Sequence, residues 1–128
     1  MAAQDSTSIS DPTQPCNQVR LTGRVAAPAL ERELPSGDAL VSWRVVVDRG
    51  ARKRGKAEPA RVPTVDALEC VAFLAGPRRV ALTLTPGDIV TVAGALRRRF
   101  WRAPGGPTSR YEVEVATLRR VRRAGAPG

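Results

Sequence analysis

Apolar and polar residues alternate along much of this chain, which is the period of a β-strand with one buried face. In the first such run, Val19, Leu21 and Val25 alternate with arginine and threonine. In the second, Val41 and Trp43 begin an apolar face that continues through two more valines, so Trp43 is predicted to lie in the core. The predicted strands are residues 19–25, 40–49, 65–73, 89–101 and 110–121.

The segments between these runs carry turn and loop residues. Residues 28–38 end in Pro-Ser-Gly-Asp and are predicted to form a loop and turn. Residues 50–63 hold five basic side chains, two glycines and two prolines, and are predicted to form a long basic loop. Residues 74–85 fit a short helix with Pro77 in its first turn. Residues 103–107 connect the last two strands, and their prolines argue against a tight two-residue turn.

Five strands with one short helix between the third and the fourth predict an all-β protein, a five-stranded OB-fold barrel. A small β-sandwich is the alternative, because the order of elements separates the two poorly. The predicted OB-fold domain spans residues 16–121. Residues 1–15 are polar and lack aromatic side chains, so they are predicted to be a disordered leader. Residues 122–128 are predicted to be a flexible basic tail.

The charge of the chain points to a polyanionic partner. Lysine and arginine total 21 against 12 acidic residues, which gives a net charge of +9. Arginine supplies most of the positive charge, and its planar guanidinium suits both phosphate binding and stacking on bases. A GC-rich genome, which favours arginine codons everywhere, is the alternative explanation.

The same composition argues against several other classes of protein. The chain has no histidine, and Cys16 and Cys70 are too few for a metal site or a disulfide framework. Cys70 lies in an apolar run and is predicted to be a free buried thiol. With no clustered carboxylates or glycine-rich phosphate loop either, we expect no enzyme and no cofactor. No signal peptide or membrane-spanning run is visible, so we expect a cytoplasmic, nucleoid-associated protein without a membrane partner.

Short motifs in a fixed order add a more specific indication. They are residues 17–25 (NQVRLTGRV), 35–37 (PSG), 43–49 (WRVVVDR), 69–73 (ECVAF), 86–97 (PGDIVTVAGALR) and 111–115 (YEVEV). With these motifs the chain resembles bacterial single-stranded DNA-binding proteins from residue 17 to about residue 121. The resemblance implies sequence-independent binding of single-stranded DNA in replication, recombination or repair. It also suggests a short paralogue, because the chain lacks the acidic C-terminal tip by which that family recruits repair enzymes, and no such recruitment is expected.

The resemblance also implies which residues contact DNA. Trp101 and Phe73 match base-stacking positions of the family, although a packed hairpin residue and a core residue are the respective alternatives. The segment 97–102 (RRRFWR) supplies both cations and rings, as binding of single strands requires. Tyr111 fits either packing or the binding surface. The predicted nucleic-acid-binding residues are Arg24, Arg44, Arg49, Arg52, Lys53, Arg54, Phe73, Arg97, Arg99, Phe100, Trp101, Arg102 and Arg110.

The family typically forms homotetramers through its first strand, so a homotetramer is expected here, with a dimer as the fallback. Two other functions remain open from the residues alone. The first is an RNA-binding or primosomal OB-fold module with the same cationic groove. The second is a protein–protein interaction subunit whose OB-fold binds a partner protein rather than nucleic acid.

Overall fold

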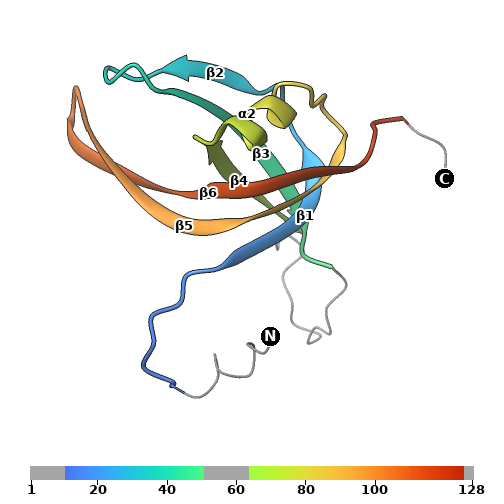
Figure 1. Ribbon diagram of the computed structural model, residues 1–128, viewed down its shortest axis with the longest axis horizontal. Helices are drawn as coiled ribbons and strands as arrows, with labels where there is room; N and C mark the ends of the chain where they lie inside the picture. Colours follow the sequence, from blue (N-terminus) through green and yellow to red (C-terminus); the bar gives the residue numbers. More distant parts are fainter. Residues whose placement is uncertain (1–10, 51–63, 126–128) are drawn as a thin grey trace.

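The computed structural model describes residues 11–50 and 64–125. It is an all-β arrangement with one short helix, as predicted (Figure 1). The elements are β1 (Val19–Val25), β2 (Leu30–Glu33), β3 (Ala39–Asp48), β4 (Val65–Ala72), α2 (Ala75–Ala81), β5 (Ile89–Ala103) and β6 (Gly106–Arg122). Within these described ranges, no helix is long and apolar enough to cross a membrane.

Five of the strands form a ladder that closes on itself. β1 pairs antiparallel with β5 and, at Arg24 and Val25, with β3. The remaining pairs are β3–β4, β4–β6 and β5–β6, of which only β4–β6 is parallel. A closed ring is the OB-fold arrangement and not that of two packed sheets. The predicted fold class is therefore confirmed, with β2 as an additional sixth strand.

The prediction for residues 28–38 was wrong in part, because they contain β2. This strand pairs with β3 from Leu30 opposite Ser42 to Glu33 opposite Ala39. All four of its residues are exposed, so it has no buried face and gives no alternating signal. The turn predicted around Pro-Ser-Gly-Asp lies between β2 and β3, where Gly37 adopts a φ of 93°.

The connection between β5 and β6 also differs from the prediction. Ala103 pairs with Gly106, so only Pro104 and Gly105 form the loop, a tight two-residue turn. Pro104 stands at the first loop position, where its fixed φ is compatible with a turn and no backbone donor is needed. The prolines therefore do not prevent the turn, and β6 begins at Gly106 rather than at residue 110.

The interior of the ring is filled mostly by valine. Val41, Val45, Val90 and Val92 are completely buried, and Trp43 is 3% exposed. The core position predicted for Trp43 is confirmed. Ala81 of α2 and Leu84 after it pack into the same core.

Cys70 is a free buried thiol, as predicted. Burial raises its pKa to about 12, and the nearby carboxylates Glu69 and Glu112 add to the shift. Cys16 is also free and is exposed. The thiol of Cys70 is therefore protonated and unreactive at neutral pH.

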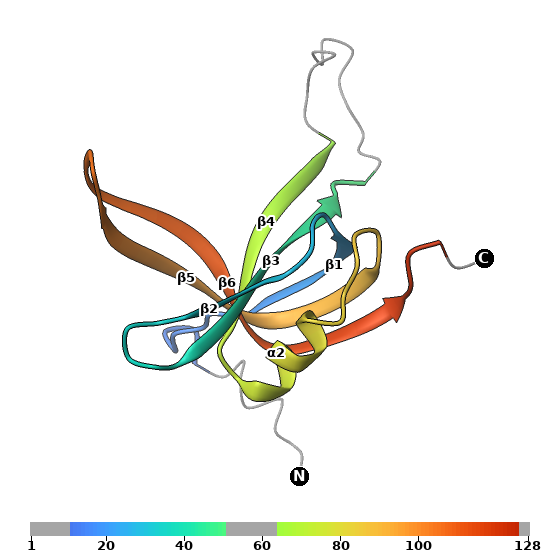
Figure 2. The same ribbon diagram turned by 90° about the horizontal axis from the view of Figure 1, so that it is seen from above.

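β5 and β6 continue beyond the ring as a projecting hairpin, which we call the arm (residues 96–111). In Figure 2 the arm stands clear of β4 and α2. Gly94 lies where the arm leaves the ring, next to a register shift in the β5–β6 pairing. A Cβ at Gly94 would overlap the carbonyl oxygen of Glu114, so the close approach of the two strands requires glycine here.

Candidate nucleic-acid interface

A groove of about 470 Å³ lies on the outer surface of the sheet. Residues of β3 and β4 alternate between the core and this surface, so the neighbours of Trp43 and Cys70 in sequence face outward. The segment after β2 and the arm form the sides of the groove. The residues that line it are Arg32, Leu34, Leu40, Ser42, Glu69, Cys70, Val71, Phe73, Arg99, Phe100, Trp101, Arg110 and Glu112.

The first stacked pair in the groove is formed by Arg99 and Phe73. The guanidinium carbon of Arg99 lies 4.9 Å from the ring centroid of Phe73, which directly follows β4. Nε of Arg99 donates a hydrogen bond to Glu112, which is 7% exposed. The buried carboxylate thus fixes the guanidinium against the ring. Nη2 of Arg99 is buried and makes no hydrogen bond within the described residues.

The second stacked pair is formed by Trp101 and Arg110, one on each strand of the arm. The guanidinium carbon of Arg110 lies 5.5 Å from the Trp101 ring centroid. Nη2 of Arg110 also lies 3.8 Å from Oε1 of Glu112, so this carboxylate faces both stacked arginines. Trp101 is 45% exposed, which leaves part of its ring open to a ligand.

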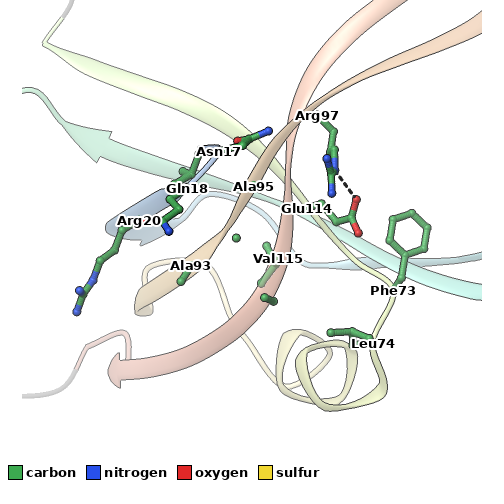
Figure 3. Close-up of a pocket in the computed structure, with 13 residues that line it drawn as sticks. Asn17, Gln18, Arg20, Phe73, Leu74, Ala93, Ala95, Arg97, Glu114 and Val115 are labelled. Atoms are coloured by element: carbon green, nitrogen blue, oxygen red, sulfur yellow. Dashed lines mark hydrogen bonds and ion pairs between the residues drawn. The ribbon is translucent and has the colours of Figure 1, made fainter. Parts of the chain in front are cut away.

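Other predicted arginines are also paired with carboxylates. Nε of Arg97 lies 3.0 Å from Oε1 of Glu114, and Nη2 of Arg44 lies 2.5 Å from Oε2 of Glu69 (Figure 3 draws the first pair). Pairs this exposed contribute little to stability, about 0–1 kcal/mol. Their effect here is to hold guanidinium groups in place and to lower the local positive charge.

Arg49 forms a similar pair at the opposite end of β3. Its Nη2 lies 2.8 Å from Oδ1 of Asp66, and the hydrogen bond to this carboxylate raises the pKa of Arg49. This places Arg49 at the far end of the β3–β4 pairing, away from the arm.

The structure brings together five of the predicted site residues in one groove: Phe73, Arg99, Phe100, Trp101 and Arg110. Arg97 lies in a neighbouring recess of about 690 Å³, which borders Phe73 as well (Figure 3). Arg44 adjoins the groove through its pair with Glu69.

The other predicted residues lie elsewhere. Arg24 is on β1, paired with Val46 and Ile89, and does not line the groove. Arg102 is exposed near the tip of the arm. Arg52, Lys53 and Arg54, with the rest of residues 51–63, lie outside the described residues.

Sequence reasoning missed several residues at or near the groove. Arg32 and Leu34 belong to the segment of β2, which was predicted to be a loop. The guanidinium carbon of Arg98 lies 5.0 Å from the Phe100 ring centroid and 5.3 Å from that of Tyr111. Adjacent strand residues point to opposite faces, so alternation places Arg98 on the other face from Arg97 and Arg99. Because all three residues are arginines, no change in polarity along the sequence marks this difference. Tyr111, left open by the sequence, is 59% exposed and therefore not part of the core.

No group of three or more potential metal-ligating side chains occurs within the residues that the structure describes. A closed OB ring with guanidinium–aromatic stacks in an outer groove defines the class of the protein, an OB-fold with an open groove on its outer surface. Comparison with known proteins then gives the family. The "Single-strand binding protein family" matches residues 16–121. The chain belongs to this family.

The chain is similar to proteins of both bacterial and eukaryotic parasite origin. A protein of Thermotoga maritima named "Single-stranded DNA-binding protein" is 32% identical over 90 residues, which is 70% of this chain. The aligned part covers 62% of that relative, so this chain spans less than two thirds of its length. A solved structure titled "Plasmodium falciparum SSB complex with ssDNA" has a TM-score of 0.63 and 20% identity. That match covers 85% of this chain and 96% of the other, and it shows the shared fold.

Proposed function

We propose that this protein binds single-stranded DNA without sequence preference, by stacking bases on aromatic side chains and neutralising phosphates with arginines. The observation that carries the proposal is the pair of guanidinium–aromatic stacks, Arg99 with Phe73 and Arg110 with Trp101, in one open groove. Aromatic rings beside cations are what binding of single strands requires, because every base can stack on a ring.

The position of the groove supports the proposal. OB-folds bind oligonucleotides on the surface of their second and third strands and at the loop between the fourth and the fifth. In the closed ring these elements are β3, β4 and the β5–β6 arm, and all three line the groove. Membership of the single-strand binding protein family, and the names of both similar proteins, point to the same ligand.

Competition between nucleic acids tests this function directly. Fluorescein-labelled oligo(dT) is bound to the protein at about 50 mM salt, and unlabelled oligo(dT), oligo(U) or duplex DNA is added as competitor. We expect oligo(dT) to displace the probe at a far lower concentration than the duplex does. Stronger competition by oligo(U) would favour the RNA-binding or primosomal alternative, and no binding of the probe would favour a protein–protein interaction subunit.

We further propose that the protein is a homotetramer, with a dimer as the alternative. Within the described residues, β1 pairs with β3 only at Arg24 and Val25, so the edge of β1 opposite β5 is open over Val19–Gly23. An open strand edge is a template for pairing with a second copy. Sedimentation equilibrium gives the mass directly, and a monomer at micromolar concentration would contradict this assembly.

The wider role that we propose is in replication, recombination or repair, at the nucleoid in the cytoplasm. Binding by stacking and charge needs no catalytic group, so the proposal includes no enzymatic reaction. The predicted site residues outside the groove, Arg24, Arg49 and Arg102, and the basic residues Arg52, Lys53 and Arg54, are proposed as additional phosphate contacts.

A further inference from the structure

The arm has two faces that differ in charge. Adjacent residues of a strand point to opposite sides, so Arg97, Arg99 and Trp101 lie on one face and Arg98, Phe100 and Arg102 on the other. We call the first the groove face and the second the back face. Register places Ser109 and Tyr111 of β6 opposite Phe100 and Arg98, on the back face.

On the groove face, two glutamates offset most of the charge of three arginines. Arg97 is paired with Glu114, and Arg99 and Arg110 both face Glu112. On the back face, the β6 positions that follow Tyr111 are the apolar residues Val113 and Val115, and residues 96–111 themselves contain no carboxylate. The side chain of Arg98 donates hydrogen bonds to the hydroxyl of Ser109, a neutral partner. Its charge, with that of Arg102, is therefore uncompensated on the arm.

The back face also exposes aromatic rings. Phe100 is 70% exposed and Tyr111 is 59% exposed, and the guanidinium of Arg98 lies over both rings, at 5.0 and 5.3 Å. Within the ring this same side of β5 and β6 carries the buried core residues Val92 and Val113. Beyond the ring this side is open, and Figure 2 shows the arm standing clear of β4 and α2.

We propose that Arg98, Phe100 and Tyr111 form a second stacking site for single-stranded DNA on the back face, so that a bound strand passes around the arm. This inference rests on the proposed function of the groove. Phe100 lines the groove and also stacks with Arg98, so it connects the two faces. A positively charged surface with exposed rings and without carboxylates matches a polyanion with flat bases.

Oligonucleotide length separates the two sites. A single OB-fold covers about 4–16 nucleotides, so oligo(dT) of about 6 nucleotides fills the groove and one of about 16 also reaches the back face. The test variant is Arg98→Gln with Tyr111→Ser, and the control is Val121→Ser, which replaces a 53% exposed residue at the other end of β6. All these side chains are exposed, so the variants are expected to fold.

For the double variant we expect a loss of about 5- to 150-fold in affinity for the longer oligonucleotide, which corresponds to roughly 1–3 kcal/mol for a lost stack. Affinity for the shorter oligonucleotide and both affinities of the control should stay unchanged. Equal binding of the longer oligonucleotide by wild type and double variant would overturn the inference. A change of sedimentation mass without a change in DNA affinity would also overturn it and assign the back face to protein assembly. If wild type binds neither length, the proposed function itself fails.

A fluorescent reporter gives a second readout. In a Trp101→Phe background, Tyr111→Trp places an indole on the back face. Because the remaining Trp43 is buried, a ligand-induced change in emission then reports on position 111. We expect the longer oligo(dT) to quench this emission and the shorter one to leave it unchanged. Unchanged emission while the anisotropy of the longer oligonucleotide reports binding would contradict a back-face site.

Discussion

The carboxylate of Asp88 is the most heavily bonded side chain in the described structure. It accepts hydrogen bonds from the backbone N–H groups of Thr85 and Ala124, at 2.9 and 2.7 Å, and from the Thr85 hydroxyl at 3.1 Å. Nε of Arg120 donates a further one at 3.2 Å. Asp88 is 2% exposed, so this network joins the turn before β5 to the end of β6 inside the protein.

These hydrogen bonds predict how stability depends on pH. They lower the pKa of Asp88 from 3.8 to about 2, with the bond from the Thr85 backbone as the largest cause. Because the folded pKa lies below the unfolded one, the ionised form stabilises the fold. This contribution is complete above about pH 4 and is lost as the pH falls towards 2.

Thermal unfolding of wild type and Asp88→Asn between pH 2 and pH 7 checks this prediction. At pH 7 the variant should be less stable by about 1–3 kcal/mol, because charged hydrogen bonds in the interior are lost. The two proteins should converge as the pH approaches 2. A difference in melting temperature that is independent of pH would contradict the assigned role of the ionised carboxylate.

At the residue level, the sequence predicted those side chains whose environment follows from strand alternation. Trp43 and Cys70 lie within apolar runs and are buried, as expected. The ion pairs could not be predicted, because Arg97 meets Glu114, and Arg44 meets Glu69, across strands whose register the sequence does not state. The bond from the Ala124 backbone to Asp88 likewise joins residues 36 positions apart.

At the level of elements, Gly94 determines how the arm leaves the ring. Its hydrogen atoms leave room for the carbonyl group of Glu114, which a Cβ would overlap. Gly105, in the turn of the same hairpin, has open space around it and is not in the positive-φ region. Gly105 therefore serves as the control position for a substitution at Gly94, because a Cβ has space at Gly105 and none at Gly94.

We predict that Gly94→Ala lowers the free energy of unfolding by about 1–3 kcal/mol, as overpacking against backbone typically does. Gly105→Ala should change it by less than about 0.5 kcal/mol, as an exposed substitution without special geometry does. Chemical denaturation of both variants measures the two values. Equal effects at both positions would show that the strands do not approach each other at Gly94 as described.

Elements with one buried face were the predictable part of the fold. β1, β3, β4 and β5 begin within one residue of their predicted starts, and the helix lies within its predicted segment. β2 was missed because it buries no face. The arm was predicted too short on the β6 side, because its residues project beyond the core and lose the apolar alternation.

At the level of the whole molecule, the distribution of charge determines how binding responds to salt. The net charge of +9 makes a polyanion the favoured partner. Several arginines at the groove, however, are already held by glutamates, so in the proposed complex phosphates would have to replace these carboxylates. The number of phosphates contacted, and not the net charge, should set the salt dependence.

Removing one phosphate contact should therefore make the salt dependence shallower. For single strands the logarithm of the binding constant falls by about 0.7 per contacted phosphate for each decade of salt. We expect Arg110→Gln in the groove to reduce this slope by about 0.7 and Arg79→Gln on α2 to leave it unchanged. Titrations between about 50 and 200 mM salt give the slopes. Equal slopes for Arg110→Gln and wild type would show that Arg110 does not contact a phosphate.

The most direct test of single-strand binding in the groove is the intrinsic fluorescence of the protein during titration with oligo(dT). The chain has two tryptophans, of which Trp43 is 3% exposed and Trp101 is 45% exposed. A change in emission when a ligand is added therefore reports on the surroundings of Trp101. We expect oligo(dT) to quench the emission, duplex DNA to leave it nearly unchanged, and Trp101→Phe to abolish the quenching. Unchanged wild-type emission, while the anisotropy of labelled oligo(dT) rises, would show that DNA binds elsewhere and contradict a stacking groove.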